Sequence, residues 1–320
     1  MKTDYLQEEL DLLLYFLGTG AGRPSLLRNV TSIALQLSAP ERDVWLFDCG
    51  EGTQHQLLSS PFTLQKITKI FITHLHGDHI FGLPGLLGSR SFLTADAELT
   101  VYGPPGIERF IREALAVSGT HLRYPFQIRE LEPGESLQLD PWTVRTALLD
   151  HGLTSLGYRI EEPPRPGRLR VEELKRLQVP PGPIYGRLKQ GEVVVLDDGR
   201  VLHGPDFVDP SIPGRSVVIL GDTRFCPAAI TLAKGADVLV HEATFAAELV
   251  ENAGAYHHAT TVQGAKTAAE AGVEKLVLTH ISSRYRPQDY ARLLSEAREV
   301  FPNTMLAEDH LAVEIPRKSR

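Results

Sequence analysis

Cysteine is scarce in this sequence. Only Cys49 and Cys226 occur among the 320 residues. Two thiols exclude the disulfide framework of a small secreted domain, so a reducing cytoplasm is the compartment that we expect. Cys49 closely follows the apolar run 44–47. We therefore interpret it as a small core residue rather than as a metal ligand or a nucleophile.

Long apolar runs are also missing. No run reaches the length of a membrane-spanning helix, and the acidic residues 1–10 lack the basic start and cleavage site of a secretory signal. We therefore expect no membrane partner. The hydrophobic content of 42% and the charged content of 23% are typical of a soluble globular protein. A chain of 320 residues is long enough for one sizeable domain or two.

An excess of positive charge is absent as well. The formal net charge of -7 argues against a general nucleic-acid coat, and we expect no DNA partner. One segment opposes this balance. Residues 165–191 hold seven basic and two acidic side chains, a local charge of 7 − 2 = +5.

The densest chemical signal is residues 73–79, THLHGDH, which follow the end of an apolar strand-like run. Imidazole nitrogens and a carboxylate are ligands that zinc accepts. His74 and His76 alternate and can point to one side of an extended chain, whereas Asp78 and His79 lie where the chain begins to turn. This loop can therefore serve two metals, and an ordinary solvated loop is a poor explanation for its composition.

Further potential ligands end three other strand-like runs. His151 follows the run 142–149, Asp222 follows 216–220, and His280 follows 275–279. Any one of them alone is more simply a turn former or a helix cap. Together with the loop they make seven ligands, which suffice for two metals if Asp222 bridges them. A shared carboxylate would offset the repulsion between two cations.

The remaining histidines fall into two groups. Surface or loop positions are expected for His55, His121, His203 and His310. His258 precedes a helix-like segment that Thr260 or Thr261 would cap. Two interpretations of His258 are equally supported by its chemistry: an ordinary loop residue, or a proton donor held by a carboxylate such as Glu242.

The pattern of strands and helices predicts a layered α/β fold with sheets inside and helices outside. We expect strands near residues 14–17, 30–37, 43–48, 217, 238 and 276. Helices are expected at 54–58, from 83 onward, and at 106–118, 226–234, 262–271 and 287–300.

The segment 161–215 is rich in proline and glycine, with PPGPIYG at 180–186, and is too broken to belong to the main core. A solvated loop is the usual fate of such a charge run. We favour a basic arm for a polyanion, because the arm accompanies a site suited to phosphate chemistry.

Several motifs together resemble the ribonuclease Z family of the metallo-β-lactamase superfamily, over nearly the whole chain and at its short-form length. The metal loop is common to the superfamily. The more specific motifs are GTGAG at 18–22, FDCGEGTQ at 47–54, GLPGLLGSR at 82–90, PPGP at 180–183, HEAT at 241–244 and HISSRY at 280–285. The resemblance implies the α/β metallo-β-lactamase fold, a four-layer αβ/βα sandwich with a protruding arm. The catalytic domain would comprise 1–160 and 206–320, and the inserted arm 161–205.

The activity implied by this resemblance is a zinc-dependent endoribonuclease that removes the 3′ trailer from precursor tRNA. It would leave a 3′ hydroxyl on the tRNA and a 5′ phosphate on the trailer. Two Zn²⁺ per subunit are implied, with Mn²⁺ or Mg²⁺ as substitutes. One metal would be held by His74, His76 and His151, the other by Asp78, His79 and His280, with Asp222 as the bridge.

The resemblance also assigns catalytic and substrate-binding roles. Asp78 would be the general base, and His258, oriented by Glu242, would protonate the leaving oxygen. A homodimer is implied, in which the arm of one subunit grips the tRNA that the other cleaves. The substrate-binding residues would be Arg284, Pro181, Gly182, Pro183, Arg187 and Lys189.

The sequence departs from the family pattern at two positions. Leu26 replaces a lysine, and Ala259 replaces a serine, so contacts to the RNA end and the treatment of a CCA sequence are open. One rival function is a small-molecule metallohydrolase, such as a phosphodiesterase, thioesterase or lactonase, which needs no arm. Another is a non-catalytic RNA-binding protein with relic ligands, although the complete set of seven speaks against it.

Overall fold

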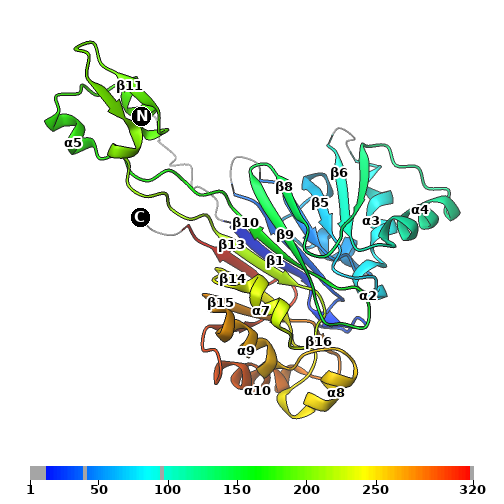
Figure 1. Cartoon of the computed structure of the whole chain (residues 1–320). Helices are drawn as coiled ribbons and strands as arrows, with labels where there is room; N and C mark the ends of the chain where they lie inside the picture. Colours follow the sequence, from blue (N-terminus) through cyan, green and yellow to red (C-terminus); the bar gives the residue numbers. More distant parts are fainter. Residues whose placement is uncertain (1–11, 39–41, 94–96, 318–320) are drawn as a thin grey trace, which may run out of the picture. The chain divides into compact units, whose positions relative to one another are not determined.

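A computed structural model of the chain describes residues 12–38, 42–93 and 97–317 (Figure 1). The acidic N-terminal stretch considered above lies outside the described residues. The chain divides into two compact units. The first comprises the chain up to Ile160 together with Ser216–Pro316, and the second comprises Glu161–Arg215 with Arg317. Among the described helices, none combines the length and the hydropathy needed to cross a membrane.

The first unit contains two seven-stranded sheets, and the first of them has the order β18-β1-β3-β4-β5-β6-β7. Its early strands pair antiparallel, whereas β4 to β7 run parallel. Buried runs of branched and aromatic residues form its inner strands, as expected for strands covered on both faces, whereas the edge strands β7 and β18 are partly exposed. The strands are β1 (Leu12–Gly18), β3 (Ser32–Gln36), β4 (Val44–Phe47), β5 (Ile67–Phe71), β6 (Leu99–Gly103), β7 (Phe126–Glu130) and β18 (Ala312–Ile315).

The second sheet has the order β17-β15-β14-β13-β10-β9-β8. Strands β13, β14, β15 and β17 are parallel, and β8 pairs antiparallel with β9. A short parallel pair, β2 (Gly20–Ala21) with β16 (Ile281–Ser282), lies outside both large sheets. The strands of the second sheet are β8 (Ser136–Leu139), β9 (Trp142–Leu148), β10 (Leu156–Glu161), β13 (Ser216–Leu220), β14 (Val238–Glu242), β15 (Lys275–Thr279) and β17 (Thr304–Leu306).

Helices cover the outer face of each sheet (Figure 1). The first sheet carries α1 (Thr53–Leu58), α3 (Leu83–Arg90) and α4 (Ile107–Val117), and the second carries α7 (Pro227–Ala233), α9 (Thr261–Ala271) and α10 (Pro287–Arg298). Shorter helical segments are α2 (Gly77–Ile80), η1 (Leu64–Lys66), η3 (Ala247–Leu249) and α8 (Val250–Ala255).

Three hydrophobic clusters show that these layers are packed together. Phe16 of the first sheet and Val240 of the second share one cluster, which therefore lies between the sheets. Leu239 and Ala265 belong to a cluster between the second sheet and its helices, and a third cluster joins the first sheet to α3 and α4. The four-layer αβ/βα arrangement predicted from the sequence is confirmed.

Most local expectations are also confirmed. The predicted strands and long helices are present, and Thr260 caps α9 with its side chain in a capping box with Gln263. Cys49 and Cys226 are free and buried, and burial raises the pKa of Cys49 to about 12, so its thiol stays protonated. The four histidines expected at the surface are exposed.

The second unit has a small core of its own. It contains α5 (Val171–Arg176), α6 (Pro183–Lys189), η2 (Gly204–Phe207) and an antiparallel pair, β11 (Val193–Val195) with β12 (Val201–His203). These short elements escape notice in the sequence because proline and glycine interrupt them. Their buried side chains are Leu169, Leu174, Val179, Leu188, Val194 and Leu202.

Candidate metal centre

The candidate site lies where strands from both sheets of the first unit end. Residues 73–79 follow β5 of the first sheet, and α2 begins within this loop. His151 follows β9, Asp222 follows β13, and His280 follows β15, all in the second sheet. Loops on a rigid sheet can hold side chains in fixed positions, and here they bring together all seven ligands proposed from the sequence.

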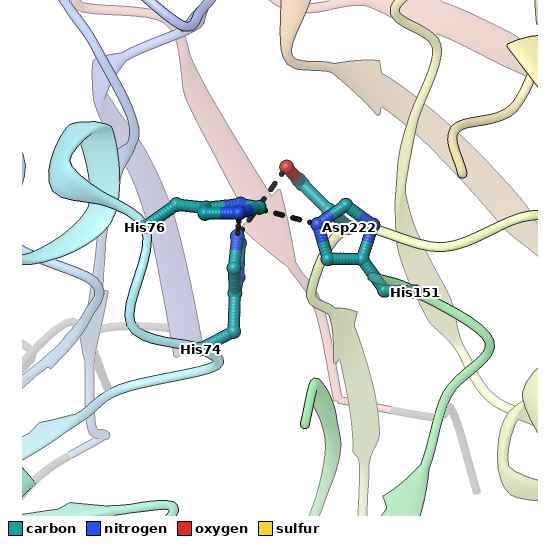
Figure 2. A group of neighbouring side chains, drawn as sticks. All are labelled: His74, His76, His151 and Asp222. Carbon is teal, nitrogen blue, oxygen red and sulfur yellow. Dashed lines mark hydrogen bonds and ion pairs between the residues drawn. The ribbon is translucent and has the colours of Figure 1, made fainter. Parts of the chain in front are cut away.

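A first cluster comprises His74, His76, His151 and Asp222, whose ligand atoms all lie within 4.8 Å of one another (Figure 2). His76 Nδ1 is 3.0 Å from His74 Nε2 and 3.2 Å from His151 Nε2. Figure 2 shows the rings of His74 and His76, which share one loop, converging with the ring of His151 and the Asp222 carboxylate from two other loops. Three nitrogens that face a common point form an arrangement suited to a cation.

A second cluster comprises Asp78, His79 and His280. Asp78 Oδ2 lies 3.6 Å from His79 Nε2 and 3.3 Å from His280 Nε2. Asp222 stands between the two clusters. Its Oδ2 atom is 3.6 Å from His74 Nε2, 3.4 Å from His79 Nε2 and 3.3 Å from His280 Nε2.

Most of these imidazoles are oriented by a second contact on the opposite ring nitrogen. His79 Nδ1 donates to Asp48 at 2.7 Å, His280 Nδ1 contacts Thr244 Oγ1 at 2.8 Å, and His151 Nδ1 contacts the carbonyl of His257 at 2.7 Å. Such contacts fix the tautomer and leave the other nitrogen for the metal.

The electrostatics of the clusters also suit cations. Burial lowers the pKa of His74, of His76 and of His151, so these rings stay neutral and can act as ligands near neutral pH. Burial would also lower the pKa of His79, but the carboxylates of Asp222 and Asp48 outweigh it and raise that pKa. The surroundings of the second cluster therefore favour positive charge.

The donor set fits divalent metal ions. Five imidazoles and two carboxylates converge, their ligand atoms are close together, and at least three rings are held from behind. Nitrogen and oxygen ligands of this kind suit zinc and its neighbours among the transition metals.

Glu242 and His258 form a hydrogen-bonded pair beside the clusters. His258 Nδ1 lies 2.8 Å from Glu242 Oε1, while Thr244 donates from its N–H and its hydroxyl to the other carboxylate oxygen. Burial would lower the pKa of His258, but the Glu242 carboxylate more than compensates and raises it to about 9. The pair can therefore hold a proton on His258 at the edge of the metal clusters.

Sequence reasoning missed Asp48. Its carboxylate accepts hydrogen bonds from the Thr73 N–H at 2.7 Å and the Thr73 hydroxyl at 2.8 Å, as well as from His79. Asp48 directly follows β4, the parallel neighbour of β5, and its backbone has a positive φ of 60°. The rule used for the other ligands, a polar residue at a strand end, would have found it.

A second group of residues, to which the sequence analysis assigned no role, holds the loop between β2 and β3. The Gly22 N–H donates to Asp78 Oδ2 at 2.7 Å. At the base of this loop, Asp309 accepts from the Asn29 N–H and the Thr19 hydroxyl, both at 2.6 Å. The buried Arg28 donates to Thr19 and to the Ala307 carbonyl. This network links Ala307 and Asp309, near the C-terminus, to the loop whose Gly22 N–H contacts Asp78.

A cavity of about 340 Å³ opens over the clusters. Its lining includes Asp78, Asp222, His258 and His280, together with Tyr256 and Arg284. Of the substrate-binding residues proposed from the sequence, Arg284 is thus beside the clusters. The other five, Pro181, Gly182, Pro183, Arg187 and Lys189, lie exposed at and within α6 of the second unit.

Comparisons with known proteins place this site in context. The family described as anti-Pycsar protein Apyc1 matches residues 12–160. The ribonuclease Z of Geobacillus kaustophilus is 55% identical over 95% of this chain and 99% of its own length. The short form of human tRNase Z superposes with a TM-score of 0.68 at 30% identity, over 95% of this chain and 99% of that one.

A third similarity concerns the fold. The metallo-β-lactamase fold protein YhfI of Bacillus subtilis superposes with a TM-score of 0.67 at 19% identity, over 95% of this chain and 99% of that one. The fold of this chain is therefore the metallo-β-lactamase fold, with two mixed sheets between helices.

Proposed function

The chain belongs to the ribonuclease Z family and is a metal-dependent endoribonuclease, and we propose that it uses two Zn²⁺ per subunit to cut the 3′ trailer from precursor tRNA. The observation that carries the two-metal proposal is the position of Asp222 Oδ2, within 3.6 Å of imidazole nitrogens from both clusters. Mn²⁺ and Mg²⁺ are the expected substitutes for Zn²⁺.

The residues of this chain would bind, orient and move protons around the scissile phosphate. His74, His76 and His151 would hold one cation, Asp78, His79 and His280 the other, and Asp222 would bridge. Bound divalent cations lower the pKa of water and neutralise charge on phosphate oxygens. Asp78 would accept the proton of the attacking water. The Gly22 N–H already holds Asp78 Oδ2 in place at 2.7 Å.

His258 would donate a proton to the leaving 3′ oxygen. Its Nδ1 is engaged by Glu242, so Nε2 is the atom left to donate. The raised pKa of His258 supports this role, because the ring holds a proton at neutral pH. The products would be a tRNA with a free 3′ hydroxyl and a trailer with a 5′ phosphate.

The direct test is incubation of purified protein with a tRNA precursor, followed by mapping of the cut ends. We expect one cut at the 3′ end of the tRNA, its loss in excess chelator, and its return with added Zn²⁺.

Asp78→Ala should remain folded and lose nearly all cleavage. Full activity of that variant would contradict the role of Asp78, and hydrolysis of small esters without cleavage of the precursor would favour a small-molecule metallohydrolase.

We further propose that the second unit binds the tRNA. Its support is the local charge of +5 over residues 165–191, which lie within this unit. Several of its cations are already paired, as Arg170 is with Glu173 and Arg187 with Glu192. Among the described residues, Arg168, Arg176 and Lys189 form no ion pair and are available for phosphates. A cytoplasmic location also fits, since both cysteines are free.

A homodimer with the second unit acting across subunits is the remaining part of the proposal, and the family resemblance supports it. Asp78→Ala has an impaired site and an intact second unit, whereas a variant with Arg168, Arg176 and Lys189 changed to Gln has the reverse. Mixing the two should restore cleavage through mixed dimers. Sedimentation as a monomer, or no gain on mixing, would contradict it.

A further inference from the structure

Two aromatic side chains and one arginine lie next to the Glu242–His258 pair. We call this group, Phe245, Tyr256 and Arg284, the ledge. Phe245 follows β14 and is 4% exposed, whereas Tyr256, at the end of α8, is 64% exposed. The two rings are stacked, with centroids 6.3 Å apart and an angle of 17° between their planes. Phe245 thus supports an aromatic ring that faces solvent.

Arg284 completes this ledge. Its guanidinium carbon lies 4.9 Å from the centroid of the Phe245 ring, and Nε is 3.3 Å from the Ser282 hydroxyl. Arg284 is exposed and forms no ion pair within the part of the chain that the structure describes. Its charge and its planar face are therefore available to a ligand.

The ledge is part of the cavity that contains the metal clusters. Phe245, Tyr256 and Arg284 line it together with Asp78, Asp222 and His258. The Phe245 ring lies 6.2 Å from the His258 ring, centroid to centroid. A phosphate at the clusters would therefore have its neighbouring nucleotide near the ledge, on the side of His258.

The chemistry of the ledge indicates a nucleobase. An exposed aromatic ring offers a stacking face that tolerates any base, and a guanidinium adds a planar cation. Single-stranded RNA ends are commonly held in this way. A packing role explains Phe245, which is buried, but not the exposed ring of Tyr256.

We propose that Tyr256 and Arg284, supported by Phe245, bind the base of the nucleotide whose 3′ oxygen leaves during cleavage. The inference rests on the proposed role of His258 as the acid for that oxygen. Stacking at this position holds the last nucleotide of the tRNA while the scissile bond lies over the clusters.

The test measures kcat/KM of the full-length protein on a precursor with an intact or an abasic nucleotide at that position. On the intact precursor, Tyr256→Ala should lower kcat/KM roughly tenfold, as for loss of one stacked base. Tyr256→Phe, which keeps the ring, should retain most of the activity. On the abasic precursor, Tyr256→Ala should cause no further loss. Phe92→Ala removes another exposed aromatic ring, 86% exposed, and serves as the matched control.

Two results would overturn the base site. One is an equal loss from Tyr256→Ala on both precursors, which would make Tyr256 a structural residue. The other is that Tyr256→Ala causes no further loss on a precursor whose first trailer nucleotide is abasic. Tyr256 would then bind the base on the trailer side of the cut and not the last base of the tRNA.

A binding measurement separates this inference from the cleavage function. A product RNA that ends in 2-aminopurine should lose fluorescence on binding to the wild type and to Tyr256→Phe, because stacking quenches the base. It should stay bright with Tyr256→Ala. This readout needs no cleavage, so unquenched fluorescence with the wild type contradicts the base site even if the precursor is cut at the expected position.

Discussion

Asp48 shows how one residue outside the ligand set can control a metal site. Asp48 belongs to neither cluster of potential ligands. Its carboxylate instead orients His79 and holds the Thr73 backbone at the start of the metal loop. A carboxylate behind a histidine ligand also makes the imidazole a stronger donor. The affinity of the second cluster for metal should therefore depend on Asp48.

We predict that Asp48→Asn lowers metal affinity roughly ten- to a hundredfold, as is usual for such outer contacts. The measurement is equilibrium competition for Zn²⁺ against a chelator, with a thermal melt to verify folding. Asp43→Asn is the matched control, because the Asp43 carboxylate accepts a hydrogen bond from the Thr68 hydroxyl of the same sheet and not from a residue of the metal loop. Unchanged affinity in Asp48→Asn would show that His79 is held by its surroundings without the carboxylate.

At the scale of elements, the site depends on close approach between loops at neighbouring strand ends. Gly50, just after β4, lies against the chain that carries Asp78. A Cβ atom at Gly50 would stand 2.3 Å from the Asp78 carbonyl oxygen, which is shorter than any real contact. The Cys49 N–H also donates to the His79 carbonyl at 2.8 Å. Glycine is therefore required there for space, and not for an unusual φ.

Gly50→Ala should push the metal loop away and destabilise the protein by about 1–3 kcal/mol, the usual cost of overpacking. Chemical denaturation would measure this change, and Zn²⁺ binding should weaken with it. Gly254→Ala is the control, because a Cβ in that helix meets nothing within 4 Å. Its effect should be neutral or slightly stabilising, since alanine favours helix. Equal stability of the two variants would contradict the tight approach.

At the scale of the whole molecule, the second unit begins and ends on a buried ion pair. The Glu162 N–H donates to the Arg215 carbonyl at 2.8 Å, and Arg215 Nε and Nη2 donate to the Glu162 carboxylate at 2.8 Å. Only 8% of the Glu162 side chain and 1% of the Arg215 side chain are exposed. Burial would raise the pKa of Glu162, but Arg215 outweighs it and lowers that pKa.

This shift sets the sign of a pH effect. A lowered folded pKa means that the stabilisation is fully present above the unfolded pKa of glutamate, about 4.3, and is lost as the pH falls through the folded pKa. Glu162→Gln should cost about 3 kcal/mol at pH 7, as for a broken buried pair. The difference in melting temperature between the wild type and Glu162→Gln should shrink below about pH 4. Glu172→Gln, which breaks an exposed pair with Lys175, should change nothing measurable. A pH-independent difference for Glu162→Gln would contradict this account.

The cations of the second unit predict a salt effect. Changing Arg168, Arg176 and Lys189 to Gln should raise KM for precursor tRNA about tenfold. The slope of log KM against log salt concentration should fall by roughly two to three, since each phosphate contact releases about one counterion. The control changes Arg109, Arg123 and Lys234 to Gln, three exposed cations of the first unit. An identical response of both variants would mean that net charge alone attracts the RNA.

The sequence alone determined the kinds of ligand and their places at strand ends. His74, His76, Asp78 and His79 stand out because one short loop concentrates them, and the flanking apolar runs predict the strands that carry them. The long helices and the layered class follow from periodicity, which is a local property. Family motifs then indicated how the ligands divide into two groups.

Only the tertiary structure decided which atoms meet. His79 and His280 are 201 positions apart, and Asp48 is 31 positions from the His79 ring that it orients. The ledge of Tyr256 and Arg284 on Phe245 likewise joins three different loops. Side-chain spacing along a strand or helix carries no record of such meetings, because they depend on how two sheets and their strand-end loops pack together.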